Sequence, residues 1–175
     1  MASSPTPLPA AEITRRLRAR FGDAVEVAEM TGQAVVRVGR DRYRELVAAL
    51  RDDRDLAFDF PDFVSAVDRG DEGLEVVTQL YSTRHRQTVR VAVPCDGDEP
   101  TCPSISDLYA GMNWHERETW ELFGIRFDGH PSLVKLLLPE QFEGYPLRKD
   151  FPLTTRVAKP WPGEEEGEAI EEVDT

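Results

Sequence analysis

The chain has 175 residues, of which 40% are hydrophobic and 31% charged, and its formal net charge is −12. This length suits one ordinary domain with its own core, and the composition is typical of a globular protein. No apolar run approaches the roughly 20 residues of a membrane-spanning helix, so membrane association should be peripheral, and the acidic balance disfavours nucleic acid as a ligand.

The first predicted element is a helix that ends at Phe21. Ile13, Leu17 and Phe21 recur every four residues and form one apolar stripe, and Gly22 is placed to end the helix. The residues before it lack the apolar segment of a secretory signal, and Glu12 is atypical of a transit peptide. We therefore expect an ordinary amphipathic helix.

A hairpin and a second helix follow. The β-rich runs 25–29 and 34–38 are separated by Thr31-Gly32, which predicts a tight turn. The second helix is predicted to start at Asp41 and to end in the charged run 51–55. Its apolar face consists of Tyr43, Leu46, Val47 and Leu50.

Three longer strands are predicted next, over 56–67, 74–81 and 88–93. Pro61 lies in the first of them and suggests an edge strand or a bulge, because proline cannot donate a ladder hydrogen bond. The order α-β-β-α-β-β-β predicts a single two-layer α+β domain, in which two helices pack on one face of a mixed sheet.

The two cysteines, Cys95 and Cys102, lie in a loop-like stretch rich in Pro, Asp and Gly. Two thiolates cannot complete a four-cysteine zinc or iron–sulfur site, so we expect no cluster in this chain. A local disulfide or a shared metal is the alternative to two ordinary thiols.

A short helix with distinct end signals comes next. Asn113 and Glu116 have the spacing of a capping box, and Gly124 is placed to end the helix. Arg117 and Glu121 are predicted to pair across one helical turn. Because aromatic residues beside Arg are enriched in contact patches, we expect this segment to be an interface. Its apolar anchor consists of Trp114, Trp120, Leu122 and Phe123.

The sequence contains no complete catalytic motif. His115-Glu116 begins like the zinc motif HExxH, but Thr119 stands in place of the second His. No glycine-rich dinucleotide or phosphate loop and no GxSxG motif occurs. Glu118, alone or beside Glu121, could do acid/base work, but nothing marks a cleft. We therefore predict no catalytic, cofactor-binding or metal-binding residue.

The region after Gly124 is rich in turns and poor in periodicity. The run 133–138 is predicted as a short apolar helical turn. Three prolines fix φ and predict an extended C-terminal arm, which lowers the cost of ordering the arm on a neighbour. These prolines are Pro139, Pro146 and Pro152. The apolar residues that would contact the neighbour are Leu147, Phe151 and Leu153.

Much of the negative charge lies at the end of the chain, where seven acidic residues and no basic residue follow Gly163. A segment of like charge with few apolar groups cannot offset the entropy of ordering, so we predict disorder there. We divide the chain into a flexible N-terminus over 1–9, the α+β domain over 10–124, the C-terminal arm over 125–160 and a disordered acidic tail over 161–175.

Two linked motifs resemble the signature of a known family. ERETWELFGIRFDGHP at 116–131 and EGYPLRKDFPL at 143–153 resemble the 30 kDa (C) subunit of respiratory complex I, the proton-pumping NADH:quinone oxidoreductase. The preceding order of elements also resembles the domain of that family. The resemblance therefore spans about residues 10–155.

The resemblance implies a non-redox subunit in the hydrophilic part of the complex, without its own flavin, cluster or NADH site. FMN, the iron–sulfur clusters and quinone would belong to partner subunits. The partners of this chain would be other subunits of the peripheral arm, chiefly the 49 kDa-type (D) subunit and the cluster-bearing subunits B and I. The complex would place the chain on the cytoplasmic face of a bacterial membrane, or on the matrix side of the mitochondrial inner membrane. The implied interface residues are Glu116, Arg117, Glu118, Phe123, Gly124, His130, Pro131, Gly144, Pro146, Leu147, Arg148, Lys149, Asp150 and Pro152.

Some residues depart from the family pattern, and other functions stay open. Glu121 stands where the family usually has Asp, and Val134-Lys135 replaces a more basic pair. The same subunit type occurs in F420-dependent and ferredoxin-dependent complexes and in membrane-bound hydrogenases, which leaves the electron donor open. From another class, a free-standing acid/base enzyme would use Glu118 or His130.

Overall fold

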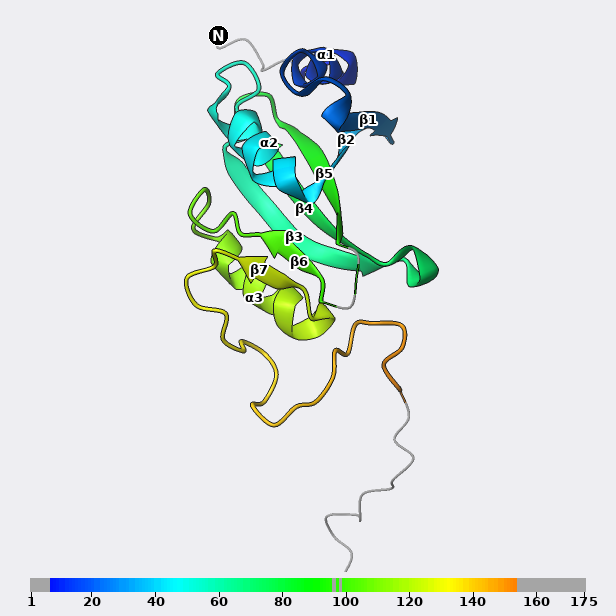
Figure 1. Cartoon of the computed structure of the whole chain (residues 1–175). Helices are drawn as coiled ribbons and strands as arrows, with labels where there is room; N and C mark the ends of the chain where they lie inside the picture. Colours follow the sequence, from blue (N-terminus) through cyan, green and yellow to red (C-terminus); the bar gives the residue numbers. More distant parts are fainter. Residues whose placement is uncertain (1–6, 96, 98, 154–175) are drawn as a thin grey trace, which may run out of the picture.

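The structure is a computed structural model that describes residues 7–95, 97 and 99–153, so the predicted acidic tail lies outside the described residues. The order of elements follows the prediction, with a third helix after the main sheet (Figure 1). Two short strands that we did not predict flank that helix. The elements are α1 (Ala10–Phe21), β1 (Val25–Met30), β2 (Gln33–Val38), α2 (Arg40–Asp52), β3 (Phe60–Asp68), β4 (Leu74–Ser82), β5 (Gln87–Cys95), β6 (Thr101–Pro103), α3 (Met112–Phe123) and β7 (Arg126–Asp128).

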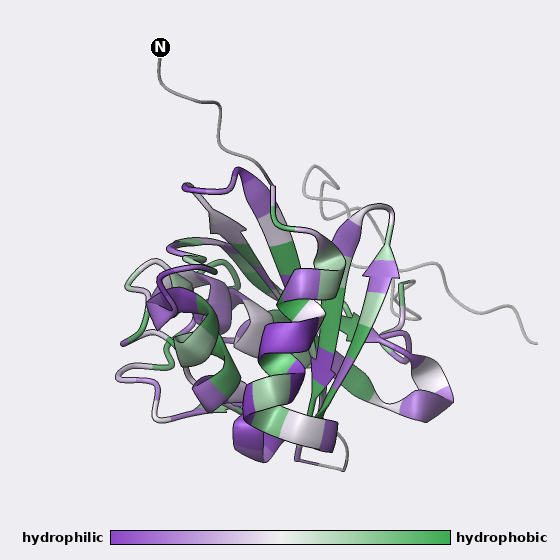
Figure 2. Cartoon of the chain, turned by 90° about the horizontal axis from the view of Figure 1, so that it is seen from above, coloured by the Kyte–Doolittle hydropathy of each residue, from purple (hydrophilic) through white to green (hydrophobic). Residues whose placement is uncertain are grey.

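The main sheet has five strands in the order β1-β2-β5-β4-β3. It is mixed, because β2 and β5 run parallel while the other neighbouring strands run antiparallel. The strands beneath the helices are largely hydrophobic, whereas the helices carry both hydrophobic and hydrophilic residues (Figure 2). β6 and β7 form a separate two-stranded parallel sheet.

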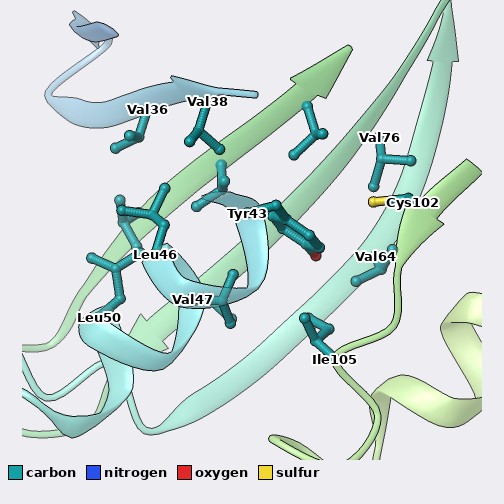
Figure 3. Packing of buried hydrophobic residues seen from close by; sticks show 14 of the residues in the cluster. Val36, Val38, Tyr43, Leu46, Val47, Leu50, Val64, Val76, Cys102 and Ile105 are labelled. Carbon is teal, nitrogen blue, oxygen red and sulfur yellow. The ribbon is translucent and has the colours of Figure 1, made fainter. Parts of the chain in front are cut away.

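The core lies between α1, α2 and one face of the main sheet. Alternate residues of each strand point to the same face. Val36 on β2 and Leu46 on α2 are fully buried (Figure 3). Val91 on β5 is fully buried as well. The Tyr43 hydroxyl, a polar group in this region, is satisfied because it lies 2.6 Å from Thr78 Oγ1.

The predicted N-terminal elements are confirmed in their main features. Ile13, Leu17 and Phe21 are buried on α1, and Gly22 ends the helix with φ 59°. The hairpin turns at Thr31-Gly32, where both φ angles are positive, as a two-residue turn of this type requires. α2 begins at Arg40, one residue before its predicted start.

β3 is an edge strand and its pairing is irregular near Pro61, as we expected from the position of this proline. Its pairing with β4 shifts in register between Pro61 and Phe63. The strand begins only at Phe60, however, so the predicted start at residue 56 is wrong. Ala57, which lies within the predicted strand, has φ 48°, which extended strand geometry does not allow.

α3 lies along the outer edge of β3. Thr119 Oγ1 is 3.3 Å from the backbone oxygen of Val64 and 2.7 Å from that of His115. The helix therefore covers backbone groups that an edge strand would otherwise expose. It also brings the residues of the first sequence motif next to the C-terminal arm.

Candidate functional site

The start of α3 differs from the predicted capping box. The helix begins at Met112 with Gly111 as its N-cap, so Asn113 is already inside the helix and makes no side-chain cap. The Glu116 carboxylate instead accepts hydrogen bonds from Ser104 Oγ at 2.6 Å and from the Ile105 amide at 2.7 Å. This carboxylate thereby joins α3 to the chain that follows β6.

Glu116 is a buried acid, with 0% of its surface exposed. Burial raises its pKa to about 7, although the hydrogen bonds from Ser104 and Ile105 oppose this rise. Arg44 lies on the other side of this contact, where it donates to the Ser104 carbonyl at 2.8 Å and pairs with Asp107.

Arg117 and Glu121 do not pair with each other as predicted. Arg117 Nε donates to the Val134 carbonyl at 2.9 Å, and its Nη2 donates to the Lys135 carbonyl at 3.1 Å. The Glu121 carboxylate accepts hydrogen bonds from three successive amides of the arm, at 2.9, 2.8 and 3.2 Å. These amides belong to 136–138. Both charged side chains therefore clamp the backbone of the arm to α3.

The predicted helical turn over 133–138 is absent from the structure. The amides of 136–138 bind the Glu121 carboxylate and so do not form an α-helical ladder. The Lys135 ammonium then closes a loop, because it donates to the carbonyls of Pro139, Glu140 and Phe142 at 3.1, 2.9 and 2.9 Å. Sequence reasoning missed this role of Lys135, and no local pattern signals it.

A second contact fixes the arm at the C-terminal end of α3. Gly124 ends the helix in the left-handed region with φ 75°, as predicted. Arg148 Nε donates to the Phe123 carbonyl at 2.6 Å, and the Arg148 guanidinium lies 4.6 Å from the centre of the Tyr145 ring. The Leu147 amide donates to the Leu122 carbonyl at 3.1 Å.

Gly124 is also required by the close packing of the arm. A Cβ atom at this position would lie 2.6 Å from Cζ of Tyr145 and 2.8 Å from Nη2 of Arg148. The residue therefore serves both the helix end and the arm.

A third contact holds the arm against the turn between β3 and β4. The Lys149 amide donates to Asp68 Oδ2 at 2.8 Å, and the Gly70 amide donates to Asp68 Oδ1 at 2.7 Å. The hydrogen bonds from these two amides lower the pKa of Asp68. Farther from α3, the rings of Phe142 and Phe151 stack at 5.9 Å.

His130 bridges α3 and the start of the arm. Its Nδ1 accepts a hydrogen bond from the Ser132 amide at 3.0 Å, and its Nε2 lies 3.2 Å from the Asn113 carbonyl. Because a backbone amide can only donate, Nδ1 is the acceptor in the contact with Ser132. Both nitrogens are used in holding the backbone.

The predicted interface residues fall into three groups by burial. Glu116 and Phe123 are buried within this chain, so their contacts here are internal. The exposed group, whose contact with a partner stays a prediction, consists of Pro131, Gly144, Leu147, Lys149, Asp150 and Pro152. The partly exposed group consists of Arg117, Glu118, Gly124, His130, Pro146 and Arg148.

Exposed apolar side chains concentrate on α3 and the arm. Trp114 is 66% exposed, so it does not anchor α3 in the core as predicted. Large exposed hydrophobic residues elsewhere in the described chain are Met30, Phe60 and Val67. Those on α3 and the arm are Trp114, Val134, Leu136, Leu137, Tyr145, Leu147 and Leu153. This surface is the candidate functional site.

The remaining candidate chemistry is limited. Cys95 and Cys102 are buried and form no disulfide, and the hydrogen bond with Cys95 together with burial raises the pKa of Cys102. Within the described residues, no group of three or more His, Cys, Asp or Glu side chains could hold a metal ion. Nor does that part of the chain include a helix long and apolar enough to cross a membrane.

Sequence comparisons relate this chain to components of a respiratory enzyme. The profile of a family described as "Respiratory-chain NADH dehydrogenase, 30 Kd subunit" matches residues 36–157. The C subunit of the NADH-quinone oxidoreductase of Roseiflexus sp. (strain RS-1) is 42% identical over 146 residues, which cover 82% of this chain and 84% of that protein. The C subunit of the Salinispora tropica enzyme is 39% identical over 137 residues. That match covers 76% of this chain and only 56% of the Salinispora protein.

Comparison with solved structures gives two related folds. A trypsin-resistant fragment of Nqo5 matches with a TM-score of 0.61 and 25% identity, over 72% of this chain and 100% of the fragment. A chain of the membrane-bound sulfane sulfur reductase, an archaeal respiratory membrane complex, matches with a TM-score of 0.72 over 91% of this chain and 98% of that chain. At 21% identity, the second likeness shows the fold alone.

Proposed function

This chain belongs to the family of 30 kDa subunits of respiratory-chain NADH dehydrogenase, and on that premise we propose that it is a non-redox assembly subunit of a proton-pumping NADH:quinone oxidoreductase. In this role it holds neighbouring subunits in place while they transfer electrons from NADH to quinone. The chain itself contributes no catalytic residue.

The observation that carries this proposal is the surface of α3 and the arm. It combines large exposed apolar side chains with a backbone that Arg117, Glu121 and Arg148 hold in one conformation. Exposed apolar groups gathered on one element are typical of a surface that becomes buried in a complex. A backbone that is already ordered loses less conformational entropy when it binds.

The polar residues of the motif region act structurally in this arrangement. Both nitrogens of His130 hold backbone groups, and Glu121 is occupied by three amides of the arm. A free-standing acid/base enzyme would need one of these groups, or Glu118, to face a substrate. The contacts of His130 and Glu121 therefore favour docking over catalysis.

The proposed partners are the 49 kDa-type (D) subunit and the cluster-bearing subunits B and I. FMN, the iron–sulfur clusters and quinone would belong to partner subunits. The chain would be attached to the cytoplasmic face of the cell membrane through these partners alone, or to the matrix face of the mitochondrial inner membrane in a eukaryote.

A related complex with a different electron donor is the second candidate. The fold also occurs in a chain of the membrane-bound sulfane sulfur reductase, so it is not restricted to NADH-quinone oxidoreductases. F420-dependent and ferredoxin-dependent complexes and membrane-bound hydrogenases are the further possibilities. The two candidates are separated by measuring NADH oxidation in membranes from the wild type and from a strain that lacks this chain. Loss of NADH:quinone activity on deletion supports the first candidate.

The purified chain and the native complex together test the role. We expect the purified chain to show no turnover of NADH or quinone. In membranes solubilised with mild detergent, the chain should co-migrate with a large complex on native gels. A monomeric pool that has activity of its own would contradict the assembly role.

A further inference from the structure

The stretch from Val134 to Phe142, called the 134–142 loop, has a fixed shape without helix or strand. Two opposite charges organise it from within this chain. The Glu121 carboxylate binds three successive amides, and the Lys135 ammonium binds three carbonyls. Leu133, just before the loop, packs against the hydrophobic core.

Several backbone groups at the tip of the loop form hydrogen bonds within the chain. The amides of 136–138 are all bound to Glu121, and the carbonyls of Val134 and Lys135 are both bound to Arg117. The Phe142 amide closes the loop on the Pro139 carbonyl at 3.0 Å. Burying a backbone group without a partner is costly, and these internal hydrogen bonds remove that cost for the amides of 136–138 and for the carbonyls of Val134 and Lys135.

The apolar side chains of the same tip point outward. Leu137 is 61% exposed, Val134 53% and Leu136 36%. The only basic residue of the loop, Lys135, is occupied by the three carbonyls, while the acidic residues Glu140 and Glu143 beside it are exposed. The tip is therefore apolar at its centre and acidic along one side.

We infer that the 134–142 loop is a preformed apolar knob that inserts into a cleft of a partner subunit, and that this cleft is apolar at its centre and basic at its rim. The inference rests on the proposed function and adds the segment that docks and the chemistry of the surface that receives it. Leu137 is the central contact. Glu121 is a positioning residue that shapes the knob without touching the partner.

The charge of the loop favours a protein cleft over a lipid surface. Peripheral proteins approach anionic membranes through exposed Lys and Arg. The loop exposes Glu140 instead, the exposed Glu143 follows it directly, and the chain as a whole has a formal net charge of −12. Carboxylates at the rim of an apolar contact match Lys or Arg on the facing protein.

The first test replaces the centre of the knob in the full chain, expressed in cells that lack the native copy. Leu137→Glu places a charge in the apolar cleft, so we expect at least a tenfold loss of the chain from the large membrane complex on native gels. Met30→Glu is the matched control, because Met30 is 59% exposed but lies on β1, away from the arm (Figure 1). The control variant should assemble like wild type.

Labelling of a cysteine at the same position tests burial directly. The two native cysteines are buried, so a Leu137→Cys variant offers one exposed thiol among the described residues. We expect maleimide to modify this thiol at least ten times more slowly in the assembled complex than in the isolated chain. An equal rate in both would overturn the inference.

A third variant separates positioning from contact. Glu121→Gln keeps the size of the side chain and removes its charge, so the amides of 136–138 should exchange their hydrogens faster in the isolated chain. Assembly should then fall severalfold, and less than in Leu137→Glu. Faster exchange without any change in assembly would show that the shape of the knob is irrelevant to docking.

The outcomes distinguish this inference from the function on which it rests. If Leu137→Glu assembles like wild type while the wild-type chain co-migrates with the complex, the inference that the loop inserts into a cleft is wrong and the assembly role stands. If the wild-type chain never enters a large complex, the assembly role itself fails. Binding of the isolated chain to vesicles containing anionic lipid, lost in Leu137→Glu, would assign the knob to a membrane and overturn the inference.

Discussion

At the scale of single residues, Glu116 makes stability depend on pH. Its carboxyl group has a pKa of about 7 in the folded chain, against an ordinary value of 4.5. Between these two values the folded state binds more protons than the unfolded state, so the free energy of unfolding falls as pH rises. From pH 5 to pH 8 the loss from this one group should be about 2 kcal/mol.

Urea unfolding of the wild type and of Glu116→Gln at pH 5 and pH 8 checks this prediction. The variant has no proton to lose at this position. From pH 5 to pH 8, its free energy of unfolding should therefore fall by about 2 kcal/mol less than that of the wild type. Glu118→Gln, on the same helix but partly exposed, should keep the wild-type slope. Equal slopes for wild type and Glu116→Gln would contradict a raised pKa.

Gly124 allows a second prediction at this scale. Gly124→Ala should destabilise the folded chain by about 2 kcal/mol, because alanine is disfavoured at φ 75° and its Cβ would collide with Tyr145. Gly32→Ala is the matched control, since Gly32 has nearly the same φ, 76°, but has open space around it. The control should show only the conformational part, about 1 kcal/mol.

The measurement is urea unfolding, combined with limited proteolysis of the arm. Gly124→Ala should make the arm more sensitive to protease, because displacing Tyr145 breaks its contact with Arg148. Gly32→Ala should leave the arm as resistant as wild type. If both variants behave alike, the packing of Tyr145 on Gly124 adds nothing to the stability of the arm.

At the scale of elements, the arm is joined to α3 more closely than its prolines alone indicate. Arg148 donates to the last turn of the helix and stacks on Tyr145, and neither contact belongs to the main core. We therefore expect Arg148→Ala to lower the amount of assembled complex while the isolated chain loses only about 1 kcal/mol of stability. Arg18→Ala is the control, because Arg18 is an exposed arginine on α1, outside the predicted interface.

Quantitative native gels and thermal unfolding measure the two effects. Normal assembly and wild-type activity of Arg148→Ala would show that the arm is not the anchor. A large loss of stability in the isolated variant would place Arg148 in the fold instead, and the assembly defect would then be secondary.

At the scale of the whole molecule, short-range patterns account for most of the fold. The spacing of Ile13, Leu17 and Phe21 predicted α1, and the position of Pro61 predicted an edge strand with an irregularity. Each of these patterns lies within a single helix or strand, so it depends little on tertiary packing. β6 and β7 have three residues each and pair across a long separation, which no local pattern can indicate.

The candidate site was less predictable, because its charged residues act over longer distances. Glu116 was expected to cap its own helix, and Arg117 was expected to pair with Glu121. Their actual partners are groups from 11 to 18 residues away, most of them on the backbone. Local helix rules apply to an isolated helix in water, whereas α3 lies between the core and the arm. The domain boundaries and the interface itself stay predictions.

The hydrogen bonds that shape the 134–142 loop also bear on how fast the complex can form. All of them lie within one chain, so the knob is complete before a partner arrives, and docking need not wait for a segment to fold. Two prearranged surfaces usually associate with rate constants of about 10⁵ to 10⁷ M⁻¹s⁻¹. The protein should therefore join its partners in a single bimolecular step whose rate follows their concentration.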